Sequence, residues 1–353
     1  MKKYLYVVCC LCLWAACQRT ESQQKIDVDL DETEAEIAYS GFAESVEYVT
    51  LSLTDSLPVG GVERLYFDGG RIFVEDSGNG GILIFDGETG RLLRRMEARG
   101  EGPEEIRLNG AFCLNPYERQ MCVFDKGDMK VKTYDYDGNF LSATPTEHFF
   151  LDMAWTDRER MTCFYPIYAG REQPEGVWSA HMSGSGVKQI DSHVTEDCRF
   201  HYFPVMYSRA DDRIYYYDRN WDELSVLTAD SLRPLYSFHI RQALPLAVKG
   251  RRDLSPQDLD GRAIVHHFAC SEHFILMSFH TFHQSDMSRK DFTWMLLDRR
   301  TGRTTVSKSL KNDLTDAGDG TETHSLFCKD SRTWVRVDDS ADDAIRLEIV
   351  HLR

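Results

Sequence analysis

The chain has 353 residues, of which 42% are hydrophobic and 28% are charged, so it can bury a core and is not a disordered polymer. Its 57 acidic side chains outnumber its 41 lysines and arginines and give a formal charge of -16. This excludes a typical nucleic-acid-binding protein, because phosphate affinity comes mainly from lysine and arginine. After the N-terminal region no apolar run reaches the roughly 18–20 residues of a membrane-spanning helix, which excludes a polytopic membrane protein.

Residues 1–16 are predicted to be a bacterial lipoprotein signal peptide. Two lysines follow the first methionine, and the apolar stretch over residues 4–14 is too short to span a bilayer but suits a secretory signal. Two alanines then precede Cys17, as in a lipobox, in which the signal peptide is cut before the cysteine and the thiol is lipidated. Trp14 departs from the leucine usual in this motif, and an ordinary signal peptide is the alternative. Lipidation of Cys17 with more than one acyl chain would anchor the protein stably to a membrane.

Residues 17–45 are predicted to be the lipidated cysteine followed by an acidic tether. Six aspartates and glutamates fall within residues 27–36, and repulsion between like charges favours an extended segment. Apolar residues alternate with acidic ones over residues 26–30, so a short edge strand is the alternative there.

Residues 46–353 have the pattern of repeated β-sheet modules. Residues 71–93 are predicted to form strand, turn, strand, turn and strand, with Asp, Asn and Gly in the turns. The same order recurs 49 positions later, from Val74 to Val123, and again 93 positions further on, at Tyr216. A strand-rich period of about 40–50 residues is typical of a β-propeller. We therefore predict one all-β domain, a six-bladed β-propeller of four-stranded antiparallel blades.

The two ends of this domain are expected to share a blade. Residues 46–52 alternate cleanly between apolar and polar, and residues 346–351 form the last predicted strand. Pairing of these strands would close the ring and remove an open sheet edge. A pair of β-sandwiches is the competing fold, but it does not explain the recurrence near 49 residues.

Three motifs resemble a known family. The sequence Gly-Glu-Gly-Pro-Glu-Glu at 100–105 follows a predicted outer strand, and Val-Phe-Asp at 123–125 and Tyr-Asp-Tyr-Asp-Gly-Asn-Phe-Leu at 134–141 come after it. This order is similar to the six-bladed β-propeller lipoproteins of Bacteroidota, distant relatives of NHL-repeat propellers. The resemblance implies an exported, lipid-anchored propeller without an established catalytic set. Residues 100–105 themselves are interpreted as a turn between blades, since three glutamates would repel an anion.

The segment 242–262 interrupts the strand pattern and is the best candidate for a binding loop. Ser255 before Pro256 predicts the start of a short helix. Lys249, Arg251 and Arg252 form the most basic patch of an acidic protein, and binding groups of propellers usually lie on loops. A purely structural insertion is the alternative.

Candidate metal and thiol chemistry is weak in this sequence. His280 and His283 are expected on opposite faces of a strand, and the acidic residues over 313–322 do not have the spacing of an EF-hand. Cys113 and Cys122 would face each other across a hairpin, where buried free thiols and a disulfide both stay open. No cofactor is predicted.

We therefore expect a lipid-anchored envelope protein with a non-catalytic binding or scaffold role. The alternative is an enzyme of the propeller lyase or lactonase type with a divalent metal in the central channel. The expected partners are the membrane, through the lipid, and an envelope protein, peptide or glycan, with the propeller itself monomeric. Gln18 after the cysteine is not the aspartate that retains lipoproteins at the inner membrane, so we expect the outer membrane and leave its face open.

Overall fold

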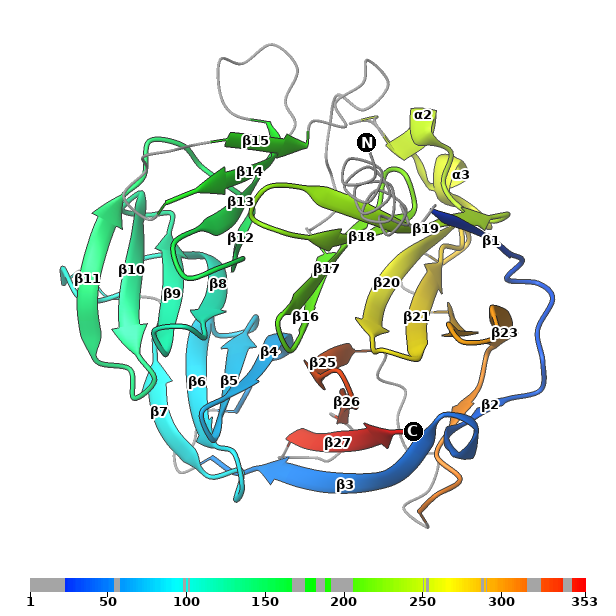
Figure 1. Cartoon of the computed structure of the whole chain (residues 1–353), viewed down its shortest axis with the longest axis horizontal. Helices are drawn as coiled ribbons and strands as arrows, with labels where there is room; N and C mark the ends of the chain where they lie inside the picture. Colours follow the sequence, from blue (N-terminus) through cyan, green and yellow to red (C-terminus); the bar gives the residue numbers. More distant parts are fainter. Residues whose placement is uncertain are drawn as a thin grey trace, which may run out of the picture.

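The chain folds into a ring of β-sheets around a central channel. The computed structural model describes residues 23–53, 58–97, 102–166, 175–181, 188–191, 206–249, 254–286, 291–315, 325–338 and 345–353, together with residues 100, 251 and 289. Its strands form six sheets that each contain four antiparallel strands, arranged as the blades of a β-propeller (Figure 1). The predicted fold class is confirmed. None of the described helices is long and apolar enough to cross a membrane.

Five blades use strands that are consecutive in the chain, and the first strand of each is innermost in the ring (Figure 1). In chain order these blades are β4 (Val62–Asp68), β5 (Arg71–Asp76), β6 (Gly81–Asp86) and β7 (Leu92–Met96); β8 (Asn109–Asn115), β9 (Gln120–Asp125), β10 (Lys130–Asp135) and β11 (Phe140–Pro145); β12 (Asp152–Trp155), β13 (Met161–Tyr165), β14 (Gly176–Ala180) and β15 (Lys188–Asp191); β16 (Met206–Ala210), β17 (Arg213–Asp218), β18 (Glu223–Leu227) and β19 (Leu232–Ile240); and β20 (Ala263–Cys270), β21 (Phe274–Thr281), β22 (Asp291–Asp298) and β23 (Arg303–Ser307).

The sixth blade closes the ring by joining the two ends of the chain. Its inner strands are β25 (Leu326–Asp330), β26 (Thr333–Asp338) and β27 (Ile345–Leu352), and its outer strand is β3 (Ala43–Leu51). The strand β3 pairs with β27 along its length, from Leu51 opposite Ile345 to Ala43 opposite Leu352 (Figure 1). The expected closure is confirmed, and it leaves neither end of the ring as an open edge.

The segment before β3 is packed on the propeller and does not form a free tether over its described part. The strand β1 (Gln24–Val28) adds to the fourth blade in parallel with β19, and β2 (Ile37–Ala38) pairs with β24 (Leu310–Lys311). Val28 and Leu30 are buried in the core between the fourth and fifth blades. Burial of these apolar residues outweighs the charge repulsion that predicted an extended segment, so the described residues before β3 are packed against the blades.

Tyr39 fastens the same segment to the sixth blade. It lies in the short 3-10 helix η1 (Tyr39–Gly41), is 1% exposed, and donates its hydroxyl proton to Glu348 Oε2 at 2.7 Å. Arg336 Nη1 lies 3.0 Å from the same carboxylate and 2.6 Å from the tyrosine oxygen. A buried ion pair with its remaining acceptors satisfied thus lies where the N-terminal segment meets the last strands.

Buried aspartates at the ends of second strands explain the recurrence at 49 positions. Asp76 Oδ1 accepts hydrogen bonds from the N–H of Gly60, in the incoming loop, at 2.9 Å and from that of Gly78, in the following turn, at 3.0 Å. Asp125 makes the same two kinds of bond in the next blade, at 3.0 Å each, to Leu108 and Gly127. Each carboxylate satisfies backbone donors where one blade leads into the next, so the repeat places an aspartate at this position.

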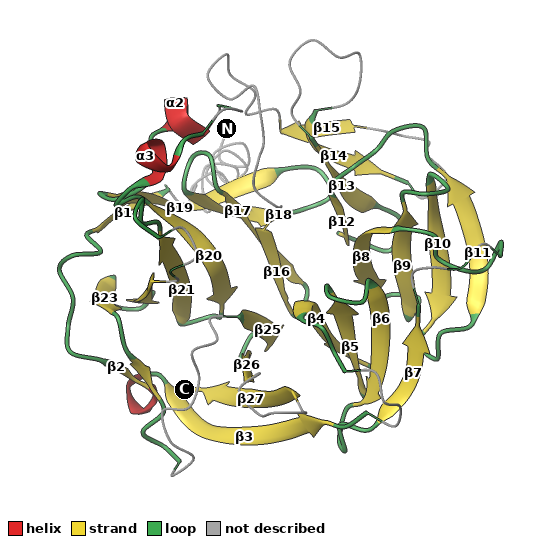
Figure 2. Ribbon diagram, turned by 180° about the vertical axis from the view of Figure 1, so that it is seen from behind, coloured by secondary structure: helices red, strands yellow, loops and turns green. Residues whose placement is uncertain are grey.

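Two short helices lie between the fourth and fifth blades, at α2 (Leu246–Lys249) and α3 (Pro256–Leu259). Ser255 precedes α3, and its N–H and hydroxyl both donate to Asp258 Oδ2, at 2.9 and 2.7 Å. The predicted helix start is confirmed, and the segment is an insertion at the edge of the ring (Figure 2).

Candidate functional site

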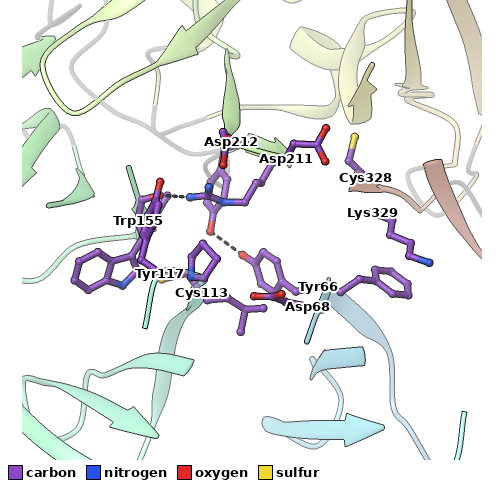
Figure 3. A pocket seen from close by; sticks show the side chains of 15 residues that line it. Tyr66, Asp68, Cys113, Tyr117, Trp155, Asp211, Asp212, Cys328 and Lys329 are labelled. Carbon is purple, nitrogen blue, oxygen red and sulfur yellow. Dashed lines mark hydrogen bonds between the residues drawn. The ribbon is translucent and has the colours of Figure 1, made fainter. Parts of the chain in front are cut away.

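Two tyrosine side chains meet inside the central channel. Tyr66 lies on β4 of the first blade and Tyr207 on β16 of the fourth, and their hydroxyl oxygens are 2.7 Å apart (Figure 3). Tyr207 also donates to the carbonyl oxygen of Met153 at 2.9 Å, and Tyr66 donates to that of Phe112 at 3.2 Å, so the two hydroxyl protons are shared among three contacts. Burial raises the pKa of Tyr66 to about 12, which keeps its proton in place. The tyrosine pair separates two pockets, and both residues line each of them.

The larger pocket has a volume of about 450 Å³ and lies where β4, β16 and β25 begin. We call it the histidine pocket and define it by side chains from the first, fourth and fifth blades: Glu63, Arg64, Ser208, Arg219, His266 and His267. Its volume falls within the range of small-molecule sites.

Two β-bulges direct neighbouring side chains into this pocket. The register of β4 against β5 shifts at Glu63, and the register of β20 against β21 shifts at His266. In a regular strand, consecutive side chains point to opposite faces, whereas an extra residue re-aims one of them. Glu63 and Arg64 therefore both line the pocket, as do His266 and His267, whose ring centroids are 4.5 Å apart.

Arg64 forms a rigid floor with groups from three blades. Its guanidinium donates to the fully buried carboxylate of Asp152, and its Nε lies 3.3 Å from Glu75 Oε2. Asn109 donates to the other oxygen of Glu75 at 2.6 Å. Burial raises the pKa of both carboxyl groups, that of Glu75 to about 7, although Arg64 opposes the shift. The positive charge of Arg64 is thus shared between two carboxyl groups of the protein.

Arg219 brings a second guanidinium to the pocket from the turn between β17 and β18. Its Nε lies 2.6 Å from Sδ of Met206, and its Nη2 donates to the carbonyl oxygen of His266 at 3.3 Å. Burial lowers the pKa of Arg219 to about 10, although Tyr217 and Glu63 raise it. The low polarity of its surroundings therefore disfavours the charge more than the nearby acidic groups favour it.

Lys249, which the sequence singles out for binding, is buried and acts within the fold. Its ammonium donates to the carbonyl oxygens of Arg219 at 2.5 Å and Asn220 at 3.3 Å, and it pairs with Asp222 at 2.8 Å. It therefore holds the turn that carries Arg219. The other two residues of the predicted basic patch do not share this role. Arg251 pairs with Asp258 at 2.8 Å near the surface, and Arg252 lies outside the described residues.

The smaller pocket, of about 340 Å³, lies where the innermost strands end. We call it the tryptophan pocket and define it by Asp68, Cys113, Tyr117, Trp155, Asp211 and Lys329 (Figure 3). In Figure 3, Trp155 and Tyr117 lie on one side of the pocket and Lys329 on the other. Arg209 donates to the carbonyl oxygen of Trp155, and Asp68 accepts the hydroxyl proton of Tyr136 at 2.5 Å. Two of its charged groups thus already have partners inside the protein.

The histidine and acidic positions considered for a metal have other partners where the structure describes them. His280 stacks on Phe292, whereas His283 Nε2 lies 2.8 Å from Asp291 Oδ2. Asp313 accepts hydrogen bonds from the backbone and side chain of Ser40 at 2.8 and 2.5 Å, and the rest of the acidic run from 316 to 322 lies outside the described residues. Within the described ranges, no three His, Cys, Asp or Glu side chains cluster closely enough to hold a metal ion.

Cys113 and Cys122 are direct cross-strand partners of β8 and β9, as the hairpin predicted. Both are buried free thiols in the structure. The indole N–H of Trp155 donates to Cys122 Sγ at 3.2 Å. The pair therefore lies in the wall behind the tryptophan pocket, with one sulfur engaged as an acceptor.

Sequence reasoning missed the histidine pocket. The pairs Glu63–Arg64 and His266–His267 are visible as adjacent polar residues inside apolar strands, which regular alternation does not explain. That irregularity is the signal that could have indicated bulges facing the channel. Arg219 has no comparable signal, because its place depends on contacts between a turn, β20 and a distant lysine.

Comparisons with known proteins agree with the fold. A family model described as a domain of unknown function (DUF4934) matches residues 23–343. The crystal structure of a putative exported protein from Bacteroides fragilis superposes with a TM-score of 0.72 at 14% identity, covering 94% of this chain and 100% of that one. A member of the DUF4221 family from Bacteroides vulgatus gives a TM-score of 0.56 at 12% identity, covering 88% and 97%. No curated protein matches the sequence. These likenesses support a propeller family found in Bacteroidota.

Proposed function

This chain belongs to the DUF4934 family, and from that premise we propose that it is an exported, lipid-anchored binding protein of the cell envelope. Its ligand occupies the histidine pocket. The role is non-catalytic, with the propeller presenting a pre-formed site to a small molecule or to one group of an envelope glycan or peptide.

One observation carries the binding role, namely that side chains from the first, fourth and fifth blades line the histidine pocket over a floor of fixed hydrogen bonds. The pair of Tyr66 and Tyr207 closes its inner end, and Arg64 is held between Asp152 and Glu75. Side chains locked in this way lose little conformational freedom when a ligand binds, which favours affinity. The two bulges that aim polar side chains at the same space support the same role.

Export and anchoring are supported by the N-terminal sequence. Residues 1–16 have the charge and hydrophobic pattern of a signal peptide, and Cys17 follows two alanines. A protein of the same fold from Bacteroides fragilis is described as a putative exported protein. We place this chain at the outer membrane, with the propeller close to the surface because residues 24–28 already pair with the fourth blade.

Anchoring is tested by expressing the full chain and its Cys17→Ser variant in a Bacteroides host. The unchanged chain should fractionate with membranes and dissolve only with detergent, and the variant should appear in the soluble fraction. A variant that stays in the membrane fraction would overturn the lipid anchor and leave the binding role standing.

Binding is tested by thermal unfolding of the detergent-solubilised full chain against a panel of envelope sugars, oligosaccharides and peptides. A ligand of the histidine pocket should raise the unfolding temperature of the unchanged protein and of Lys329→Ala in the tryptophan pocket, but not of His266→Ala. Equal shifts in all three proteins would contradict the proposed site. If a compound of the panel is instead converted to a product over time when incubated with the protein, the lyase or lactonase alternative is favoured.

A further inference from the structure

We propose that the histidine pocket selects ligands carrying an oxyanion, a carboxylate, sulfate or phosphate, which binds where Arg219 meets His266 and His267. This inference rests on the proposed function and names the class of ligand. It concerns a small ligand, because the space of about 450 Å³ lies inside the ring.

The charge of the pocket wall has the opposite sign to that of the whole protein. The chain carries a formal charge of -16, yet the wall contains three arginines and two histidines. Among the described residues that line it, Glu63 is the one carboxylate, and its side chain is exposed. A local positive region on an acidic protein attracts anions that the rest of the surface repels.

The three arginines make different contacts within the described part of the chain. Arg64 is held by Asp152 and Glu75, so we assign it to the floor. Arg209 donates to a backbone carbonyl, that of Trp155, and Arg219 donates to a backbone carbonyl and a thioether. Hydrogen bonds to neutral acceptors leave the positive charge of a guanidinium in place, so it can still attract an anion.

One backbone contact and one ring contact bring Arg219 and the two histidines together. The guanidinium of Arg219 reaches the backbone of His266 at 3.3 Å, and the imidazole rings of His266 and His267 are 4.5 Å apart. A guanidinium beside two imidazoles offers several N–H donors to one group of oxygens. The geometry therefore suits a planar or tetrahedral oxyanion.

Burial of the Arg219 guanidinium also favours an anion beside it. The pKa of Arg219 is lowered to about 10 because its surroundings penalise the charge. A bound oxyanion would share that low-polarity environment and supply charge-assisted hydrogen bonds, which are about twice as strong as neutral ones. Glu63 raises the pKa of Arg219 and opposes anion binding, but its side chain is exposed, where solvent and salt screen its charge.

The test compares matched charged and neutral probes by isothermal titration calorimetry on the detergent-solubilised full chain. The probes are D-glucuronate against D-glucose for a carboxylate, and inorganic sulfate and phosphate for the other oxyanions. At least one anion should bind, with an affinity that falls as salt concentration rises, and glucose should bind at least 10-fold more weakly.

Variants then locate the site. Arg219→Gln, and separately the double variant His266→Gln/His267→Gln, should weaken the anion by about 10-fold or more, whereas Arg219→Lys should lose less. Arg299→Gln is the matched control, because Arg299 is also a partly buried arginine that donates to a backbone carbonyl, that of Ser271 at 2.6 Å, outside the pocket. Circular dichroism of each variant separates lost binding from lost folding.

The outcomes separate the inference from the proposed function. If a neutral ligand binds in a way that depends on His266 and no anion binds, the oxyanion inference is wrong and the proposed binding pocket stands. Anion binding that Arg219→Gln leaves unchanged, or that Lys329→Gln in the tryptophan pocket abolishes, would overturn this location. Absence of binding by any probe, charged or neutral, in a folded protein would overturn both.

Discussion

The ammonium of Lys249 donates a hydrogen bond of 2.5 Å to the backbone carbonyl of Arg219, 30 positions earlier in the chain. The same ammonium pairs with Asp222, and Tyr217 donates to the other oxygen of that carboxylate at 3.0 Å. A helix at the edge of the ring is thereby connected to a turn that faces the channel. The basic insertion thus contributes to the pocket by positioning its arginine.

Replacing Lys249 by methionine should destabilise the fold. The change keeps most of the side-chain volume but leaves Asp222 buried without its partner, and breaking a buried pair costs about 3–5 kcal/mol. Urea unfolding of both proteins measures the difference. Arg251→Gln removes the exposed pair with Asp258 and should change the free energy of unfolding by less than about 1 kcal/mol. Similar effects of the two changes would contradict the role of Lys249.

Glu75 should make stability depend on pH. Its pKa is about 7 in the folded protein, mainly because it is buried, and 4.5 is its ordinary value. Between these values the folded state holds a proton that the unfolded chain releases, so the free energy of unfolding falls as the pH rises through this window. The full fall corresponds to about 3 kcal/mol and levels off above the folded-state pKa.

Glu75→Gln is the variant that isolates this effect. It removes the titrating group, while Arg64, Asp152, Glu63 and the histidines remain in both proteins. Urea unfolding at pH 5 and pH 8 should show a smaller loss of stability in the variant than in the unchanged chain. Parallel pH profiles would show that Glu75 titrates normally in the folded protein.

The tyrosine pair should be coupled in its energetics. Tyr207→Phe removes the donor to the Met153 carbonyl and Tyr66→Phe removes the donor to the Phe112 carbonyl, and each change also removes the contact between the two hydroxyls. Each lost hydrogen bond is worth about 1 kcal/mol, so each single change should destabilise the fold by about 1–2 kcal/mol. The double variant should be less destabilised than the sum of the two single changes. Strict additivity would mean that the two hydroxyls do not interact.

The cysteine pair is expected to remain reduced. Cys113 and Cys122 are buried, and the sulfur of Cys122 accepts the indole proton of Trp155 at 3.2 Å. Alkylation of protein purified under non-reducing conditions should modify neither residue while folded and both after denaturation. Peptide mass spectrometry distinguishes this from a disulfide, which would leave both unmodified until a reductant is added.

The architecture could be predicted from sequence because the repeat has a local physical cause. Asp76 and Asp125 satisfy the same backbone donors in successive blades, so the turn signals recur at a fixed spacing. Strand alternation over residues 46–52 was likewise enough to identify the closing strand. Both features depend on residues that are near each other in sequence or on a simple period of two.

The candidate site could not be predicted in the same way. Regular alternation along a strand predicts which face of the sheet each side chain points to, and the bulges at Glu63 and His266 break that alternation. Lys249 looked exposed because it lies in a basic stretch, yet its acceptors come from a turn about 30 residues away. Docking of residues 23–42 was hidden by their charge, although the buried apolar positions were already visible as an alternating pattern.

Native mass spectrometry of the full chain, purified from the envelope of a Bacteroides host in a mild detergent, tests the central claim most directly. The account predicts a small bound molecule with an anionic group in the unchanged protein, lost from Arg219→Gln but retained by the matched control Arg299→Gln. A molecule retained equally by all three proteins, or one lost from both variants, would contradict the histidine pocket as the binding site.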